Sequence, residues 1–247
     1  MSGPRFVLFD YGNTLVPFGR DESEVVGRAV ASVVASRVPG LEPLAFAERA
    51  DRVRDRLIRA TRLSGREVTN AEFASALAVE AGIGEPPDGF ERELEERVGE
   101  AFVRVLRLPP DTLPVLDALS AGRRLGLVSN YYLARPLRRS LDRLGIRPRL
   151  TAAVISAEVG FVKPRPEPFL AALGALEAEP RECVFVGDNP AADVAGAAAL
   201  GMRTVLTREW HRGALASDLE ETGPGMEPDL VVDRLADLPA AIETFGR

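Results

Sequence analysis

The 247-residue sequence contains one cysteine, one histidine and one lysine. The single cysteine, Cys183, excludes an internal disulfide and a zinc site built from several cysteines. The single histidine, His211, likewise excludes a histidine cluster. No apolar run is long enough to cross a bilayer, and the first one is too short for a signal peptide. We therefore expect a globular, cytoplasmic protein.

Negative charge outweighs positive charge in the sequence. The chain has 31 basic and 37 acidic residues, which gives a formal net charge of −6 at pH 7. This charge balance gives no reason to expect binding to nucleic acid or to an anionic membrane surface. Hydrophobic residues make up 46% of the sequence, enough for a sizeable core. We expect neither nucleic acid nor a membrane as a partner, and a monomer or a homodimer.

Lys163 is the single lysine among the 31 basic residues. An ammonium group is a compact, mobile point charge that the planar guanidinium of arginine cannot imitate. Lys163 lies in the segment 160–169, where three prolines stiffen the backbone. On composition alone, the single lysine is explained equally well by a functional role and by chance retention of a lysine on the surface.

Short apolar runs typical of buried parallel strands recur along the chain. They cover residues 5–9, 125–129, 152–155, 183–186, 203–206 and 230–232. Helix-like segments lie between most of them, at residues 132–144, 168–176, 190–200 and 238–244. This alternation predicts an α/β fold with a Rossmann-like, doubly wound parallel sheet.

One interval breaks the alternation. Residues 18–106 have a helical pattern throughout, with candidate helices at residues 22–38, 43–62, 70–81 and 88–106. Proline and glycine occur at the entry, residues 16–19, and two prolines occur at the exit, residues 108–111, as expected where a chain leaves one domain and enters another. We expect residues 1–17 and 107–247 to form the core and residues 18–106 to form an inserted, all-helical domain.

Asp10 directly follows the first predicted strand. Ligands of open α/β sheets bind at the carboxyl ends of the strands, which is where this carboxylate is expected. The small residues behind it, Gly12 to Thr14, can turn backbone N–H groups inward and form a cradle for an anion. The same residue types are common in ordinary turns, so this segment alone leaves both interpretations open.

Two later strands also end in polar side chains. Ser129 and Asn130 follow one of them, where they could hold a phosphate oxygen or simply cap the next helix. Asp188 follows the other, with Asn189 as a candidate N-cap and Asp193 in the first helical turn. An acidic residue is favourable in a first turn in any case. The two carboxylates are nevertheless expected to face the strand ends together.

Asp10, Ser129, Lys163 and the Asp188/Asp193 pair occur in this order, each soon after a predicted strand. In this ordered set the chain resembles the haloacid dehalogenase-like hydrolase superfamily, over residues 5–14 and from about residue 115 onward. The helical insert lies where that family has its cap domain, although the sequence of the insert gives no specific match.

The resemblance implies that Asp10 is a nucleophile that attacks the phosphorus of a small phosphorylated substrate. A phospho-aspartate would form, which water then hydrolyses. The resemblance also implies a Mg²⁺ ion held by Asp10, the carbonyl of Gly12 and Asp188, with Asp193 close by.

It further implies that Lys163 is a catalytic residue that neutralises charge on the phosphate. The phosphate-binding residues it implies are Ser129, Asn130, Thr14 and Lys163. The expected activity is that of a magnesium-dependent phosphatase.

Gly12 departs from the pattern of the family's phosphatases, which usually have a second aspartate there as the general acid and base. Loss of such a group typically lowers the rate by ~10²–10⁴-fold. We therefore expect slow turnover, or a preference for good leaving groups such as acyl and aryl phosphates. Tyr11 and Asp21 are weak substitutes, because Tyr11 is one position away and Asp21 belongs to the start of the insert.

Two other functions remain open on the sequence. A metal-independent 2-haloacid dehalogenase is one, although the family's dehalogenases lack an acid at the position of Asp188. A catalytically idle protein that binds phosphate or metal is the other, since Gly12 removes a catalytic group. A phosphonate hydrolase of this family uses a lysine of the cap, and residues 18–106 contain no lysine.

Overall fold

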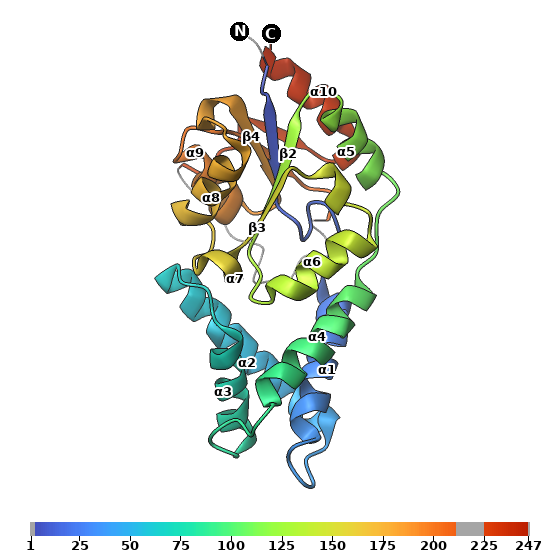
Figure 1. Cartoon of the computed structure of the whole chain (residues 1–247), viewed down its shortest axis with the longest axis vertical. Helices are drawn as coiled ribbons and strands as arrows, with labels where there is room; N and C mark the ends of the chain where they lie inside the picture. The colour runs from blue at the N-terminus through green and yellow to red at the C-terminus, as the bar shows by residue number, and fades with distance from the viewer. Residues whose placement is uncertain (1–2, 211–224, 247) are drawn as a thin grey trace.

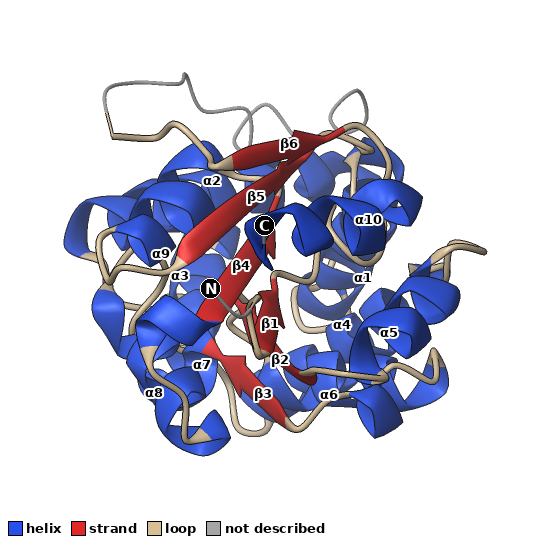
Figure 2. Cartoon of the chain, turned by 90° about the horizontal axis from the view of Figure 1, so that it is seen from above, coloured by secondary structure: helices blue, strands red, loops and turns tan. Residues whose placement is uncertain are grey.

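The computed structural model describes residues 3–210 and 225–246, so His211 lies outside the described residues. A six-stranded parallel sheet, in the order β3-β2-β1-β4-β5-β6, forms its centre (Figure 2). The strands are β1 (Phe6–Phe9), β2 (Arg124–Ser129), β3 (Ala152–Ile155), β4 (Cys183–Gly187), β5 (Arg203–Thr207) and β6 (Leu230–Val232). The six predicted strands agree with these bounds to within one residue at each end.

Helices cover both faces of the sheet, which is therefore doubly wound. Alternate residues of β1 point to opposite faces: Val7 and Phe9 enter one hydrophobic core, and Leu8 enters another. The first core includes side chains of α5 (Thr112–Ser120), α6 (Ala134–Arg143) and α10 (Leu238–Glu243). The second includes side chains of α8 (Pro166–Leu176) and α9 (Gly196–Ala198). The predicted fold class is confirmed.

Three details of the chain differ from the predicted helices. The predicted helix 190–200 begins as a π-helical turn, Pro190–Ala195, and continues as α9. The short helix α7 (Ser156–Val159) was not expected from the sequence, and neither was α5. Pro114 indicates a break in a helix when it is read from the sequence. In the structure it lies in the first turn of α5, where proline is tolerated.

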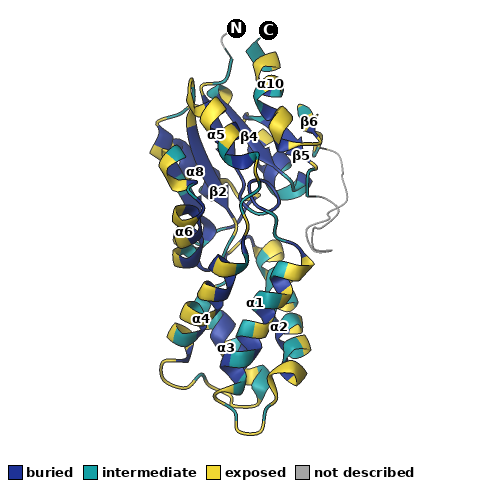
Figure 3. Ribbon diagram, turned by 90° about the vertical axis from the view of Figure 1, so that its right-hand side faces the viewer, coloured by how far each residue is buried: buried dark blue, intermediate teal, exposed yellow. Residues whose placement is uncertain are grey.

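Four helices between β1 and α5 form what we call the helical lobe, residues 20–105. They are α1 (Arg20–Ala35), α2 (Pro43–Ser64), α3 (Asn70–Ala81) and α4 (Phe90–Val105). The lobe lies beyond the carboxyl ends of the strands (Figure 1), and its helices bury their inner faces on one another (Figure 3). The four predicted helices match these bounds to within three residues. None of the described helices has the length and apolar character needed to cross a membrane.

Sequence signals set the ends of these helices. Pro43 occupies the first turn of α2, and Gly65, with φ of 71°, ends it in the left-handed conformation that glycine adopts readily. Thr69 begins α3 with a capping box, because its hydroxyl accepts from the N–H of Glu72 while the Glu72 carboxylate accepts from the N–H of Thr69. The short segment between α2 and α3 is thereby held in place.

Candidate functional site

The order of the strands reverses between β1 and β4, and the site lies at this point. Asp10 follows β1 directly and donates its backbone N–H to the carbonyl of Val186 in β4. Asp188 follows β4 directly, and Asp193 lies in the helical turn beyond it. One carboxylate oxygen from each of the three aspartates lies within 4.8 Å of the others. Open α/β sheets bind ligands at such a switch point.

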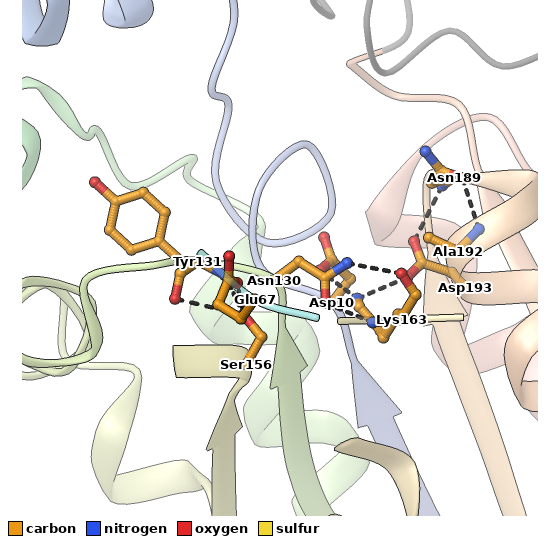
Figure 4. Close-up of polar contacts among 9 residues, drawn as sticks. All are labelled: Asp10, Glu67, Asn130, Tyr131, Ser156, Lys163, Asn189, Ala192 and Asp193. Atoms are coloured by element: carbon orange, nitrogen blue, oxygen red, sulfur yellow. Dashed lines mark hydrogen bonds and ion pairs between the residues drawn. The ribbon is translucent and has the colours of Figure 1, made fainter. Parts of the chain in front are cut away.

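Lys163 lies in the middle of this cluster and is only 3% exposed. Its Nζ donates to Oδ1 of Asp10 and to Oδ1 of Asp193, both at 2.6 Å (Figure 4). The side chain of Asn130 clamps the backbone of the lysine: its amide donates to the Lys163 carbonyl at 3.0 Å, and its oxygen accepts from the Lys163 N–H at 2.8 Å. The single lysine is thus buried among carboxylates, not left on the surface.

Burial and charge act against each other in this cluster. Burial raises the pKa of Asp10 from 3.8 to about 6, although attraction by Lys163 opposes the rise. Burial alone would lower the pKa of Lys163, but Asp10 and Asp193 raise it above its usual value. Lys163 is therefore a cation at neutral pH. The cluster has three carboxylates and one lysine, so a further positive charge beside the carboxylates would be favourable.

A tight turn after β4 fixes Asp193. The side chain of Asn189 accepts from the N–H groups of Ala191 and Ala192, which confirms its predicted role as an N-cap. The N–H of Asn189 donates in turn to Oδ2 of Asp193 at 3.0 Å. A Cβ atom added at Gly187 would overlap the carboxyl group of Asp193. Glycine is therefore required at this position for the carboxylate to lie where it does.

We expect Gly187→Ala to displace the Asp193 carboxylate and to weaken binding of a divalent cation by roughly tenfold or more. Isothermal titration with Mg²⁺ measures this. Gly174→Ala is the matched control, because a Cβ added at Gly174 in α8 meets no atom within 4 Å. The control should bind the cation as the wild type does. Equal affinity of both variants would contradict this role of Gly187.

A cavity of about 530 Å³ opens between the strand ends and the helical lobe. Most of the predicted site residues line it, namely Asp10, Gly12, Ser129, Asn130, Lys163, Asp188 and Asp193. Thr14 is not among the lining residues: it is fully buried in the turn after β1, and its hydroxyl has no hydrogen-bond partner among the described residues. The structure therefore brings together seven of the eight predicted residues.

The two substitutes considered for the acid and base at Gly12 are differently placed. The hydroxyl of Tyr11 is bonded to Oγ of Ser140 at 2.6 Å, and burial raises the pKa of Tyr11 to about 12. Asp21 is exposed in the first turn of α1 and does not line the cavity. Neither side chain presents an acid to the cluster in this structure.

Glu67 lines the cavity and was missed from the sequence, because it lies in the helical lobe, far along the chain from every motif. Its backbone N–H donates to the carbonyl of Gly160 at 2.9 Å, and the N–H of Val162 donates to the carbonyl of Gly65 at 3.0 Å. Its carboxylate accepts from Ser156 and from the N–H of Val68. The lobe is thereby joined to the loop that leads directly to Lys163.

We expect Glu67→Gln to be at least as stable as the wild type at about pH 8 and to lose that advantage near pH 4. Burial raises the pKa of Glu67, although the hydrogen bonds from Ser156 and Val68 oppose the rise. A pKa raised in the folded state means that wild-type stability falls as the pH rises from the unfolded to the folded pKa. Glutamine keeps the shape without this titration.

Urea unfolding at the two pH values measures the difference. Glu67→Ala is the companion variant, and it should cost about 1–3 kcal/mol because it leaves buried polar groups without partners. An advantage of Glu67→Gln that grows on acidification would contradict this account of Glu67.

Comparison with known proteins identifies the family. A sequence model described as haloacid dehalogenase-like hydrolase matches residues 4–201, which is most of the chain. The chain belongs to the haloacid dehalogenase-like hydrolases. The predicted family and the prediction of a hydrolase are thereby confirmed.

Two relatives of the chain are named as phosphatases. The chain is 28% identical over 235 residues to a ribulose-1,5-bisphosphate 5-phosphatase of Halopiger xanaduensis, covering 94% of this chain and 96% of that protein. It is 37% identical over 139 residues to a glyceraldehyde 3-phosphate phosphatase of Methanopyrus kandleri, covering 56% and 58% of the two chains.

A solved structure, a 2-haloacid dehalogenase of Pseudomonas syringae pv. Tomato DC3000, matches with a TM-score of 0.71 and 24% identity, covering 98% and 99% of the two chains. At that identity the likeness shows the shared fold and nothing of the reaction. The hydrolase fold itself therefore accommodates more than one reaction, and the residues of the site must decide between them.

Proposed function

We propose that this hydrolase is a magnesium-dependent phosphatase that acts on a small phosphorylated substrate through a phospho-aspartate intermediate. The single observation that carries the proposal is the cluster of Asp10, Asp188 and Asp193 around Lys163 at the switch point of the sheet. Two relatives named as phosphatases support it.

The donor set fits Mg²⁺. Hard divalent cations prefer oxygen ligands, and the three aspartates offer carboxylate oxygens within 4.8 Å of one another. In the proposal Asp10, Asp188 and the carbonyl of Gly12 hold the ion, with Asp193 close to it. When bound, the ion supplies positive charge that offsets the repulsion between the aspartate and an anionic phosphate.

Asp10 is the proposed nucleophile. One of its carboxylate oxygens forms a bond to phosphorus as the bond from phosphorus to the leaving oxygen breaks, and the leaving oxygen takes the electron pair. Water then attacks the phosphorus, which releases phosphate and restores the carboxylate of Asp10. The ammonium of Lys163 touches Asp10 and is placed to neutralise charge on the transferring phosphoryl group.

In the proposal, the other predicted residues bind the phosphate or position Lys163. Ser129, at the end of β2, donates its hydroxyl to a phosphate oxygen. Asn130 acts by holding the backbone of Lys163, through the two hydrogen bonds that join them. Thr14 stays a prediction as a phosphate-binding residue, although its side chain is fully buried and does not line the cavity.

The helical lobe serves as the cap in this proposal, with residues 18–106 as the inserted domain and residues 1–17 and 107–247 as the core. A cap that covers the cavity excludes water from the phosphoryl transfer. The cytoplasmic location and the monomeric or homodimeric state stay predictions.

Hydrolysis of acetyl phosphate with and without Mg²⁺ tests the proposal. We expect turnover that depends on Mg²⁺ and is lost with a chelator. Release of halide from a 2-haloacid without metal would instead favour the dehalogenase. Binding of Mg²⁺ and phosphate without turnover of any phosphate ester would favour the idle binding protein, and either result would overturn the proposal.

A further inference from the structure

We infer that the substrate is a small aryl phosphate, in which the phosphate is attached to an aromatic ring. The inference rests on the proposed phosphatase function and deepens it by naming the substrate class. A wall of aromatic side chains in the cavity carries the argument, together with the absence of an acid at Gly12.

Besides Tyr11, five aromatic rings line the cavity beside the aspartate cluster. They are Phe18, Phe73, Phe102, Tyr131 and Tyr132. Each ring contacts the next: the centroid distances are 5.7 Å from Phe18 to Phe102, 4.4 Å from Phe102 to Tyr131, 5.4 Å from Tyr131 to Tyr132 and 5.1 Å from Tyr132 to Phe73. The rings therefore form one continuous wall.

This wall is built from both parts of the molecule. Phe73 belongs to α3 and Phe102 to α4 of the helical lobe, whereas Tyr131 and Tyr132 follow β2 directly after the predicted phosphate-binding pair. A phosphate held at the strand ends would therefore place the group attached to it next to the rings. Aromatic rings favour offset or edge-to-face contact with another ring by about 0.5–1.5 kcal/mol beyond area burial.

Apolar side chains line part of the lobe surface in the cavity, beside charged ones such as Arg62 and Glu67. Val30 of α1 and Leu57 of α2 line it. Arg54 also lines it, but its guanidinium is already paired with Asp51 at 3.0 Å and with Asp55 at 3.3 Å. A second phosphate or carboxylate on the substrate would have to compete with these two carboxylates for Arg54. A compact apolar ring avoids that competition.

The leaving group gives an independent argument. With Gly12 in place of an aspartate, an alcohol has to depart without a proton from that position. A phenol has a pKa near 10, roughly six units below the pKa of water and of simple alcohols. A phenolate is therefore a far better leaving group than the anion of an alcohol. In the reaction the phosphorus–oxygen bond breaks, the phenolate takes the electron pair, and solvent water protonates it. The cavity volume of about 530 Å³ accommodates such a molecule.

Binding of two phosphonates, which cannot be hydrolysed, tests the inference separately from turnover. With Mg²⁺ present, we expect phenylphosphonate to bind the wild type at least about tenfold more tightly than methylphosphonate, because burial of a ring contributes about 1.5–3 kcal/mol. Equal affinities would overturn the inference and leave the proposed phosphatase function standing. Hydrolysis of acetyl phosphate, measured in parallel, reports on that function alone.

Variants locate the effect. Tyr132→Leu keeps apolar bulk and removes a ring, so KM for phenyl phosphate should rise about two- to tenfold and by a larger factor than KM for acetyl phosphate. Phe245→Leu is the matched control, since Phe245 stacks on Arg203 and does not line the cavity. An equal change with both substrates, or the same change in the control, would overturn the inference. Phe73→Leu provides a second ring variant if Tyr132→Leu folds poorly.

Discussion

Asp10→Asn is expected to lower the hydrolysis of acetyl phosphate and phenyl phosphate by at least about 10⁴-fold. Asparagine has nearly the same shape as aspartate, but its amide oxygen cannot act as the nucleophile in the proposed reaction. The substitution also removes a charge that Lys163 contacts at 2.6 Å. The expected loss is in kcat, because the missing bond forms only during the reaction.

Circular dichroism and thermal unfolding provide the control for Asp10→Asn. Leu8 and Phe9, which precede Asp10 in β1, are fully buried and unchanged, so we expect the sheet to fold as before. A folded variant that retains the turnover of the wild type would contradict the role of Asp10. A variant that fails to fold would be replaced by Asp10→Glu, which lengthens the side chain and keeps its charge.

Lys163→Arg is expected to lower turnover by about 10²–10³-fold, although it preserves the charge. The ammonium fits between Asp10 and Asp193 in a space where the lysine is only 3% exposed. The planar guanidinium is larger and directs its donors along a fixed fork, so it cannot take this place without moving the carboxylates. Steady-state kinetics with acetyl phosphate measures the loss.

Lys163→Met removes the positive charge and keeps a long, flexible side chain, so it tests the charge of Lys163 separately from its shape. It leaves two buried carboxylates without their cation, and we expect a loss of stability of about 3–5 kcal/mol, reduced when Mg²⁺ is added. Arg165→Met is the control, because that arginine is exposed, where it pairs with Glu167 and lies over the ring of Phe161, so a much smaller change is expected. An unchanged unfolding midpoint in Lys163→Met would contradict the account of the cluster.

The centre of the fold could be predicted because each strand is a short apolar run that ends in a polar residue or is followed directly by one. Asp10, Ser129 and Asp188 mark three strand ends, and parallel strands bring such ends to one edge of the sheet. The unusual use of lysine drew attention to Lys163, although composition alone explained a chance surface lysine equally well. The helical pattern of residues 70–81 likewise placed the beginning of α3 at the correct residue.

The surroundings of the site could not be predicted, because they depend on which loops meet in space. Ser156 and Glu67 are 89 positions apart, and no periodic pattern relates them. The aromatic wall likewise joins residues of α3 and α4 to the two tyrosines after β2. Apolar periodicity indicates that Phe73 faces inward, but it cannot indicate that a cavity lies beside it.

The most direct test of the central claim is acid-quench trapping of the intermediate. Wild-type enzyme is mixed with Mg²⁺ and radiolabelled acetyl phosphate, quenched in acid within the first turnover and digested, and the labelled peptide is identified. We predict an acid-stable, base-labile phosphoryl group on the peptide that contains Asp10, and none in Asp10→Asn. Rapid product formation without label on that peptide, or label on another residue, would contradict the account.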